Sequence, residues 1–247
     1  MVPDRKPYRR EAEDKRRQAL IEATLALVSE GGAKNATVRA IAQRAGVTAG
    51  LIRHYFQGKD QLIATAYRHL MDRMTLDSAV VLNAAPLDPQ ARLAAFVAAS
   101  LRPPVVDPEA LILWATFLQE TQRDPAMRAI HAETYLGFRD LLQSLIAALP
   151  GPRPEAELRS LAIACNAVID GLWMEGCALP EAFGRGELVE VGIRGVGAIL
   201  GLDLRPFMLL SAPIQFYPPS ANSTAAPSAN STAAPSANLI ALGDSAR

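Results

Sequence analysis

The segment from Thr37 to Phe56, TVRAIAQRAGVTAGLIRHYF, places the strongest constraint on the fold of this 247-residue chain. Its first half carries apolar residues at the spacing of one helix face: Val38, Ile41, Ala42 and Ala45. Gly46 follows as a tight turn, and Ile52 and Phe56, four residues apart, give a second short helix an apolar inner face. Two short helices joined in this way are typical of a helix-turn-helix, and a plain helical hairpin is the alternative.

The outer side and start of the second short helix are small or polar, and we expect them to meet DNA. These residues are Thr48, Ala49, Gly50, Leu51, Arg53, His54 and Tyr55. Small residues at the start let the helix enter a major groove, Arg53 can pair with a guanine edge, and the two residues after it can reach bases or phosphates. Thr37, Thr48 and Lys59 are placed to bind phosphates through hydroxyls, helix-end amides or charge.

Charge is unevenly distributed, although the whole chain balances 25 basic against 25 acidic side chains. Residues 1–60 hold 12 Lys or Arg and 7 Asp or Glu, so the N-terminal part is basic and the remainder acidic. A basic head beside an acidic body fits a polyanion partner such as double-stranded DNA. An ordinary solvated charge run would give the same balance.

Apolar spacing and capping residues predict an all-α chain, because no segment shows sustained period-two alternation. Outside the motif we expect helices at 14–29, 60–82, 88–101, 108–122, 125–149, 155–179 and 186–200. Asp107-Pro108 and Asp124-Pro125 each place an N-cap before a first-turn proline, which favours a helix start. The last positions of several helices are followed by Gly or Pro, which end a helix.

Composition divides the chain into four expected parts. They are a flexible basic arm at 1–13, a DNA-binding domain at 14–74, a helical ligand-binding and dimerisation domain at 75–204, and a low-complexity disordered tail at 205–247. The tail contains the repeat PSANSTAA, which is too polar to bury a core.

Several classes of function lack their sequence signals. Cys165 and Cys177 lie in an apolar stretch and are expected to be buried small hydrophobes, with no disulfide framework. His54, His69 and His131 have no metal-ligand spacing, and no nucleophile or phosphate-loop motif occurs, so we expect no metal, no cofactor and no enzyme activity. With neither a signal peptide nor a membrane span visible, we expect a cytoplasmic protein.

The stretch ALIEATLALVSEGGAKNATVRAIAQRAGVTAGLIRHYFQGKDQL has a Gly before a capped Thr, an aromatic pair near a helix end, and Lys59 followed by an acidic residue. On these residues, positions 16–70 resemble the DNA-binding domain of the TetR family of bacterial repressors. VSEGGAKNATVRAIAQRAGVTAGLIRHYF, WATFLQETQRDPAMRAIHAETYLGFRDLL and VIDGLWMEGCAL are similar to the BetI-like branch, which represses choline-to-glycine-betaine genes. The resemblance covers residues 14–200 and implies a repressor released from its operator by a small effector.

The resemblance also implies an all-helical second domain whose last two helices form a four-helix bundle with a second subunit. A broad apolar face on the first of them is compatible with a homodimer: Leu158, Leu161, Ala162, Cys165, Val168, Ile169 and Leu172. Gly192, Gly195 and Gly197 each weaken an isolated helix by about 1 kcal/mol and fit close packing against another helix. The alternative is that these faces only close the core of one chain.

Aromatic residues of the second domain recur at helical spacing and are candidates for an effector site. The candidate ligand-binding residues are Trp114, Phe117, Glu120, Tyr135, Phe138, Asp170 and Trp173. Converging rings can hold a quaternary ammonium by cation–π contact, worth about 0.5–2 kcal/mol per ring, and the two carboxylates could balance its charge. The same rings could instead be plain core, and Asp170 could bind a helix end or a partner subunit.

Choline or another quaternary amine is the effector that the resemblance implies. Two alternatives remain: a TetR-like regulator of efflux or catabolic genes with a different hydrophobic effector, and a helical partner-binding protein without DNA binding. Arg53 and the basic arm favour DNA binding over the second alternative.

Overall fold

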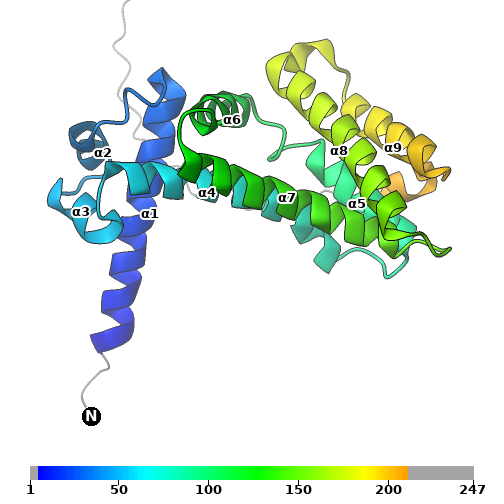
Figure 1. Ribbon diagram of the computed structural model, residues 1–247, viewed down its shortest axis with the longest axis horizontal. Coiled ribbons are helices and arrows are strands. Elements are labelled where there is room, and N and C mark those ends of the chain that lie inside the picture. Colours follow the sequence, from blue (N-terminus) through cyan, green and yellow to red (C-terminus); the bar gives the residue numbers. More distant parts are fainter. Residues whose placement is uncertain (1–4, 211–247) are drawn as a thin grey trace, which may run out of the picture. The chain divides into compact units, whose positions relative to one another are not determined.

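The computed structural model describes residues 5–210, with side chains from 12 to 208. Over this part of the chain the fold is all-α, as the sequence predicts, and it contains no strand. The helices are α1 (Arg5–Gly31), α2 (Val38–Arg44), α3 (Gly50–Phe56), α4 (Lys59–Ala79), α5 (Pro89–Ser100), α6 (Pro108–Thr121), α7 (Pro125–Ala147), α8 (Glu155–Ala178) and α9 (Glu187–Leu200) (Figure 1). Three short 3-10 helices lie at Val80–Asn83, Pro180–Ala182 and Arg205–Leu210.

Aspartate caps followed by proline start three of these helices. The side chain of Asp107 accepts a hydrogen bond from the Glu109 N–H at 3.0 Å, and that of Asp124 accepts one from the Ala126 N–H at 2.8 Å. Asp88 does the same for α5. Each cap satisfies an N–H that lacks a partner within its helix, and proline fits the first turn because it lacks an N–H. The two caps predicted from the sequence, at Asp107 and Asp124, are therefore confirmed.

The helical region extends further at both ends than the sequence indicated. α1 begins at Arg5, so residues 5–13 are helical and the expected flexible arm at 1–13 is wrong for that part. The segment is rich in Glu, Lys and Arg, which form helices without burial. Arg205–Leu210 forms a 3-10 helix, so the expected disordered tail cannot begin at 205. Phe207 and Met208 pack against the core, and residues 211–247 lie outside the described part.

The described helices enclose two main clusters of buried side chains. We call α1–α3 with the first half of α4 the head, and α5–α9 the body. The body core is built around Phe96, Leu142, Cys165 and Ile193. The head core is built around the fully buried residues Leu20, Ile41, Ile52, Phe56 and Tyr67, and it also includes Leu113, Phe117 and Met127 from the body.

The boundary expected between residues 74 and 75 falls inside α4, which continues without a break to Ala79. The head core includes α4 residues up to Met71, whereas Met74 borders both cores. Head and body are therefore joined by a continuous helix and by a shared core.

Glycines in α9 allow close packing within the chain. A Cβ atom at Gly197 would lie 2.6 Å from the Leu202 carbonyl oxygen, and one at Gly192 would overlap the Leu101 side chain. The sequence predicts close packing of these glycines against another helix, whereas Gly197 lies against the turn that follows α9 and Gly192 against the C-cap of α5, both in the same chain. Among the described helices, α8 is long and apolar enough to cross a membrane by length and composition alone. Ala162, Cys165 and Ile169 of α8 are buried in the body core, which accounts for its apolar composition.

Candidate nucleic-acid interface and ligand cavity

Helices α2 and α3 meet at a tight turn with the geometry expected from the motif. Gly46 has a φ of +65°, a backbone conformation that glycine adopts without strain. The Thr37 hydroxyl caps α2 by accepting a hydrogen bond from the Ala40 N–H at 3.1 Å. Ile52 and Phe56 are each only 1% exposed, which confirms the inner face of α3. On the apolar face of α2, Ile41 and Ala42 are buried, whereas Val38 in the first turn is 38% exposed.

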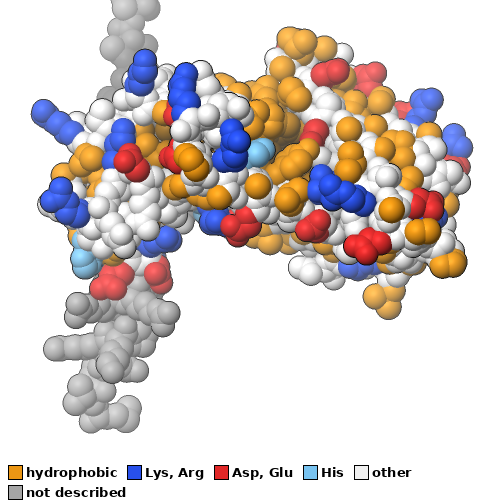
Figure 2. All heavy atoms as spheres, in the orientation of Figure 1, with side chains coloured by type: hydrophobic (Ala, Val, Ile, Leu, Met, Phe, Trp, Pro, Cys, Tyr) orange, Lys and Arg blue, Asp and Glu red, His pale blue; other side chains and the backbone are white. Residues whose placement is uncertain are grey.

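The predicted DNA-contacting residues lie on or beside α3, except for Thr37 at the start of α2 and Lys59 at the start of α4. Exposed members are Thr37, Thr48, Ala49, Gly50, Arg53 and His54, and partly buried members are Leu51, Tyr55 and Lys59. Apart from its chain neighbours and the adjoining backbone of α3, no described protein atom would lie within 4 Å of a Cβ at Gly50, so this end of α3 is open to an incoming surface. Figure 2 shows Lys and Arg side chains around this part of the head.

One detail of the α3 start differs from the sequence prediction. α3 begins at Gly50 with Ala49 as its N-cap, and no side chain caps it. The Thr48 carbonyl oxygen accepts a hydrogen bond from the Leu51 N–H at 3.0 Å, which forms a turn before the helix. The Thr48 hydroxyl is therefore not used as a helix cap and remains exposed.

Polar contacts hold α3 and α2 against α1. The Arg17 guanidinium lies over the Phe56 ring at 5.1 Å from its centroid, and Arg44 makes a two-pronged ion pair with Glu30, one contact being 2.8 Å. Cation–π contacts and two-pronged Arg–carboxylate pairs are directional, so these contacts orient α2 and α3 on α1, although the exposed Arg44–Glu30 pair contributes little to stability. The motif can thus present one rigid face to a groove.

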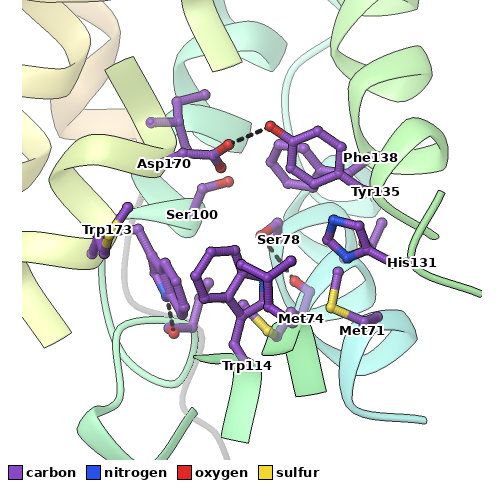
Figure 3. Close-up of a pocket in the computed structure, with 15 residues that line it drawn as sticks. Met71, Met74, Ser78, Ser100, Trp114, His131, Tyr135, Phe138, Asp170 and Trp173 are labelled. Atoms are coloured by element: carbon purple, nitrogen blue, oxygen red, sulfur yellow. Dashed lines mark hydrogen bonds between the residues drawn. The ribbon is translucent and has the colours of Figure 1, made fainter. Parts of the chain in front are cut away.

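A cavity of about 410 Å³ lies where α4, α5, α6, α7 and α8 meet. Figure 2 shows a hollow between α6, α7 and α8 that is edged by hydrophobic side chains. Five of the predicted ligand residues line the cavity: Trp114, Tyr135, Phe138, Asp170 and Trp173 (Figure 3). A largely apolar hollow with a few convergent polar groups is the usual form of a small-molecule site.

Aromatic rings form opposite walls of this cavity. Trp114 and Trp173 meet edge to face, with centroids 5.8 Å apart and planes at 77°. The Trp173 indole N–H donates to the Val105 carbonyl oxygen at 2.8 Å, which fixes the ring (Figure 3). Phe138 packs on Phe96 of the body core at 5.1 Å. These rings are therefore held in place before any ligand enters.

Asp170 supplies a carboxylate to the same cavity. The Tyr135 hydroxyl donates to Asp170 Oδ2 at 2.7 Å (Figure 3). Asn166 Nδ2 donates to the same oxygen at 2.8 Å. Burial raises the pKa of Asp170, while the hydrogen bonds from Tyr135 and Asn166 and the nearby His131 act in the opposite direction. Burial, together with the hydrogen bond to Asp170, raises the pKa of Tyr135 to about 12, so this phenol stays protonated.

Two predicted ligand residues lie elsewhere. Phe117 is fully buried and stacks on Tyr67 in the head core at a centroid distance of 4.8 Å. Glu120, near the end of α6, does not line the cavity, and its Oε1 lies 3.9 Å from the Arg123 guanidinium nitrogen Nη1. Phe117 shares the helix face of Trp114, but that face spans both the cavity and the head core, so spacing alone does not separate them.

The cavity also contains residues that the sequence prediction omitted. α4 contributes Met71, Met74, Thr75 and Ser78, which recur at the spacing of one helix face. α7 contributes His131, which precedes Tyr135 and Phe138 by four and seven residues. Both sets follow helical periodicity, so that spacing is the signal that would have found them.

Metal-ligating side chains and the two cysteines are the remaining candidates for other sites in the described residues. Over the described residues there is no cluster of three or more His, Cys, Asp or Glu side chains suited to a metal ion. Cys165 and Cys177 are buried, as predicted, and burial raises the pKa of each thiol to about 11. A protonated, buried thiol is a poor nucleophile and metal ligand.

Comparison with known proteins decides the family. Residues 20–66 match the profile described as "Bacterial regulatory proteins, tetR family", and residues 89–201 match "BetI-type transcriptional repressor, C-terminal". The HTH-type transcriptional regulator BetI of Paraburkholderia phymatum is 33% identical over 168 residues, which are 68% of this chain and 84% of that protein. The chain belongs to the TetR family. BetI of Serratia proteamaculans is 34% identical over 179 residues, covering 71% and 88% of the two chains.

Solved structures agree with this assignment to the TetR family. A putative transcriptional regulator from Pseudomonas aeruginosa PAO1 matches with a TM-score of 0.68 and 32% identity, covering 78% of this chain and 94% of that one. This chain is thus a BetI-type transcriptional repressor with a helix-turn-helix head. Regulators of the TetR family bind operator DNA, dimerise and bind small effectors, which agrees with the coarse prediction from the sequence.

Proposed function

We propose that this repressor binds operator DNA through α3 and is released when an organic cation, with choline as the first candidate, occupies the cavity. The observation that carries the proposal is the combination of four aromatic side chains with one carboxylate around a single hollow. A helix-turn-helix regulator of this kind acts in the cytoplasm on chromosomal DNA.

The lining chemistry favours a cation with an apolar surface. Faces of Trp, Tyr and Phe rings attract a quaternary ammonium, each contact contributing about 0.5–2 kcal/mol. The Asp170 carboxylate supplies the opposite charge, and hydrogen bonds from Tyr135 and Asn166 to its Oδ2 orient it. A neutral acyl chain would fill the apolar part but leave this partly buried carboxylate uncompensated, which is costly.

One structural neighbour was solved with choline bound. A putative transcriptional regulator from Saccharomonospora viridis was solved in complex with choline, and it matches this fold with a TM-score of 0.57 at 20% identity. At that identity the likeness concerns the fold. The support for choline here comes from Asp170 and the aromatic rings of this chain.

Release from DNA would follow from a population shift. The ligand must bind more tightly to an arrangement in which the two recognition helices of a dimer no longer fit successive major grooves. Coupling of this kind is typically worth about 1–3 kcal/mol, and operator DNA must weaken ligand binding by the same factor. α4 connects the two sites, because Met71 and Met74 line the cavity while Leu62 and Tyr67 lie in the head core.

A homodimer through α8 and α9 completes the proposed function. Ile163 of α8 and Val191 of α9 are 42% and 43% exposed, which is high for side chains of this size and polarity. Ala162, Cys165 and Ile169 of the predicted interface are instead buried within the chain, so the exposed residues are the better candidates. A symmetric pair of heads would read two half-sites of a near-palindromic operator.

Tryptophan fluorescence offers a direct test, because the chain has two tryptophans and both line the cavity. Choline is titrated into the full-length protein, and the titration is repeated with 3,3-dimethylbutanol, a neutral compound of the same shape. We expect a saturable change with choline and a much weaker response to the alcohol. Operator release is then followed by fluorescence anisotropy over the same choline range. No fluorescence change and no release at millimolar choline would remove choline as the effector.

A further inference from the structure

A row of four stacked rings runs from the head core to the cavity wall. Phe117 of α6 stacks on Tyr67 of α4 with centroids 4.8 Å apart and planes at 25°. Tyr67 lies parallel to His131 of α7, at 6.2 Å and 4°, and His131 stacks on Tyr135 at 5.4 Å and 21°. The first two rings belong to the head core, and the last two line the cavity.

One hydrogen bond crosses from the head to the cavity within this row. The Tyr67 hydroxyl and His131 Nδ1 lie 2.7 Å apart. Burial raises the pKa of Tyr67 to about 12 and lowers the pKa of His131, so the phenol is protonated and the imidazole is neutral near pH 7. The hydrogen bond thus joins two neutral groups, and its direction follows the tautomer of the imidazole.

We propose that His131 is the positioning residue through which the occupied cavity acts on α4, by way of its hydrogen bond to Tyr67. This inference rests on the proposed function, because it assigns the route by which the cavity controls the head. His131 is the member of the row that both lines the cavity and bonds to α4. A ligand that contacts Tyr135 or His131 displaces a ring whose neighbours are already in contact on both sides. Because the interior around Tyr67 is closely packed, a shift of His131 is transmitted to Tyr67 and through it to α4.

A second contact between the same two helices provides a matched control. Arg68 of α4 makes a two-pronged ion pair with Glu133 of α7, both contacts being 2.7 Å. Glu133 is 66% exposed on its side chain, and neither residue lines the cavity. Exposed ion pairs contribute little, and this one has no contact with a bound ligand. Glu133→Gln should therefore leave the coupling between ligand and operator unchanged.

The first test needs no effector. Operator binding must act back on the cavity if the link exists, because coupling is reciprocal. Imidazole nitrogen resonances are recorded for the three histidines of the chain, with each signal assigned by substitution, in the free protein and on a duplex selected by the protein from random DNA. We expect the His131 signals to shift when the duplex binds, and the shift to vanish in Tyr67→Phe. His131 signals that ignore the duplex in the wild-type protein would overturn the inference.

The second test measures the coupling itself with choline as the probe. Choline affinity is measured with and without the selected duplex for the wild type, Tyr67→Phe, His131→Phe and Glu133→Gln. Tyr67→Phe keeps the ring that stacks on Phe117, and His131→Phe keeps a ring in the row. We expect both to reduce the coupling factor about 2- to 12-fold, the effect of one hydrogen bond. In the absence of choline, the operator affinity of Tyr67→Phe and His131→Phe should differ from that of the wild type by less than about twofold. The coupling factor of Glu133→Gln should also differ from the wild-type value by less than about twofold.

The outcomes separate the two proposals. If choline does not bind the wild type, the choline assignment fails and the resonance experiment still decides the route. If choline binds and releases DNA but Tyr67→Phe keeps the full coupling factor, the route through His131 is wrong and the proposed function stands. Equal loss of coupling in Glu133→Gln would also overturn the inference, because any weakening of the α4–α7 contact would then have the same effect.

Discussion

Tyr135 and Asp170, which are 35 positions apart on α7 and α8, are joined by a hydrogen bond of 2.7 Å from the phenol to the carboxylate. The bond orients the carboxylate within the cavity and compensates part of the cost of burying it. Burial still dominates, because the pKa of Asp170 is raised overall. The cavity therefore holds a charge that the folded protein tolerates at a cost.

Asp170→Asn should raise the stability of the ligand-free protein and weaken choline binding. A folded-state pKa above the unfolded value gives a contribution to stability that is complete below the unfolded pKa and is lost as the pH rises through the folded pKa. Above the raised folded-state pKa the ionised Asp170 is therefore destabilising, and each kcal/mol gained in the free energy of unfolding should raise Tm by about 2–4 °C. Choline affinity should fall by about tenfold or more, since an attraction of at least about 1.4 kcal/mol is lost.

The raised pKa of Asp170 predicts that choline affinity depends on pH. Choline affinity of the wild type should decline as the pH falls through the raised pKa of Asp170, because the protonated carboxyl no longer attracts a cation. Calorimetric titrations at several pH values should show a flatter profile for Asp170→Asn. A lower Tm for the variant, or an undiminished pH slope, would contradict this account of the carboxylate.

Arg53→Ala should selectively weaken specific DNA binding. Arg53 is exposed on α3, where a bidentate contact to a base is worth about 1–3 kcal/mol of discrimination. Anisotropy titrations with the selected duplex and with random DNA measure the two affinities. Equal loss on both would assign Arg53 to a phosphate, and no loss on either would remove it from the interface.

Much of the fold could be predicted from the sequence because its signals are local. Asp107 and Asp124 act through backbone groups two or three residues away, so the helix starts follow from the chain itself. The cavity depends on which helix faces meet, and local spacing does not contain that information. Trp114 and Phe117 look equivalent on α6, yet one lines the cavity and the other stacks on Tyr67. The spacing of His131 with Tyr135 and Phe138 indicates their shared face on α7, but the hydrogen bond of His131 to Tyr67 has no local signal because the two residues are 64 positions apart.

Deletion of residues 211–247 should leave Tm unchanged, whereas deletion of 205–247 should lower it. The longer deletion removes Phe207 and Met208, which pack on the body core, and partial burial of two such side chains is worth about 1–3 kcal/mol. Thermal unfolding of the two truncated proteins beside the full chain makes the comparison. A matching fall in both would show that the stabilising segment lies beyond residue 210.

Ile163→Arg should yield monomers with poor operator affinity. Ile163 is 42% exposed on α8, so the substitution need not disturb the core of one chain, whereas a charge at a buried subunit contact is costly. Sedimentation velocity gives the oligomeric state, and circular dichroism checks the fold. Glu157→Arg, an exposed charge change near the start of the same helix, serves as the control. A dimer of unaltered affinity would place the subunit contact elsewhere.

The shared head core also limits how such proteins can be recombined. Leu113, Phe117 and Met127 complete the packing around Tyr67 and Leu70. The head core is therefore formed partly by residues of α6 and α7. A chimera cut at residue 74 would inherit the recognition helix but would set Tyr67 against a foreign α6. New DNA specificity is therefore more readily acquired by substitutions on the open side of α3 than by exchange of whole heads. An exchanged head would need matching changes in the residues of α6 and α7 that share its core.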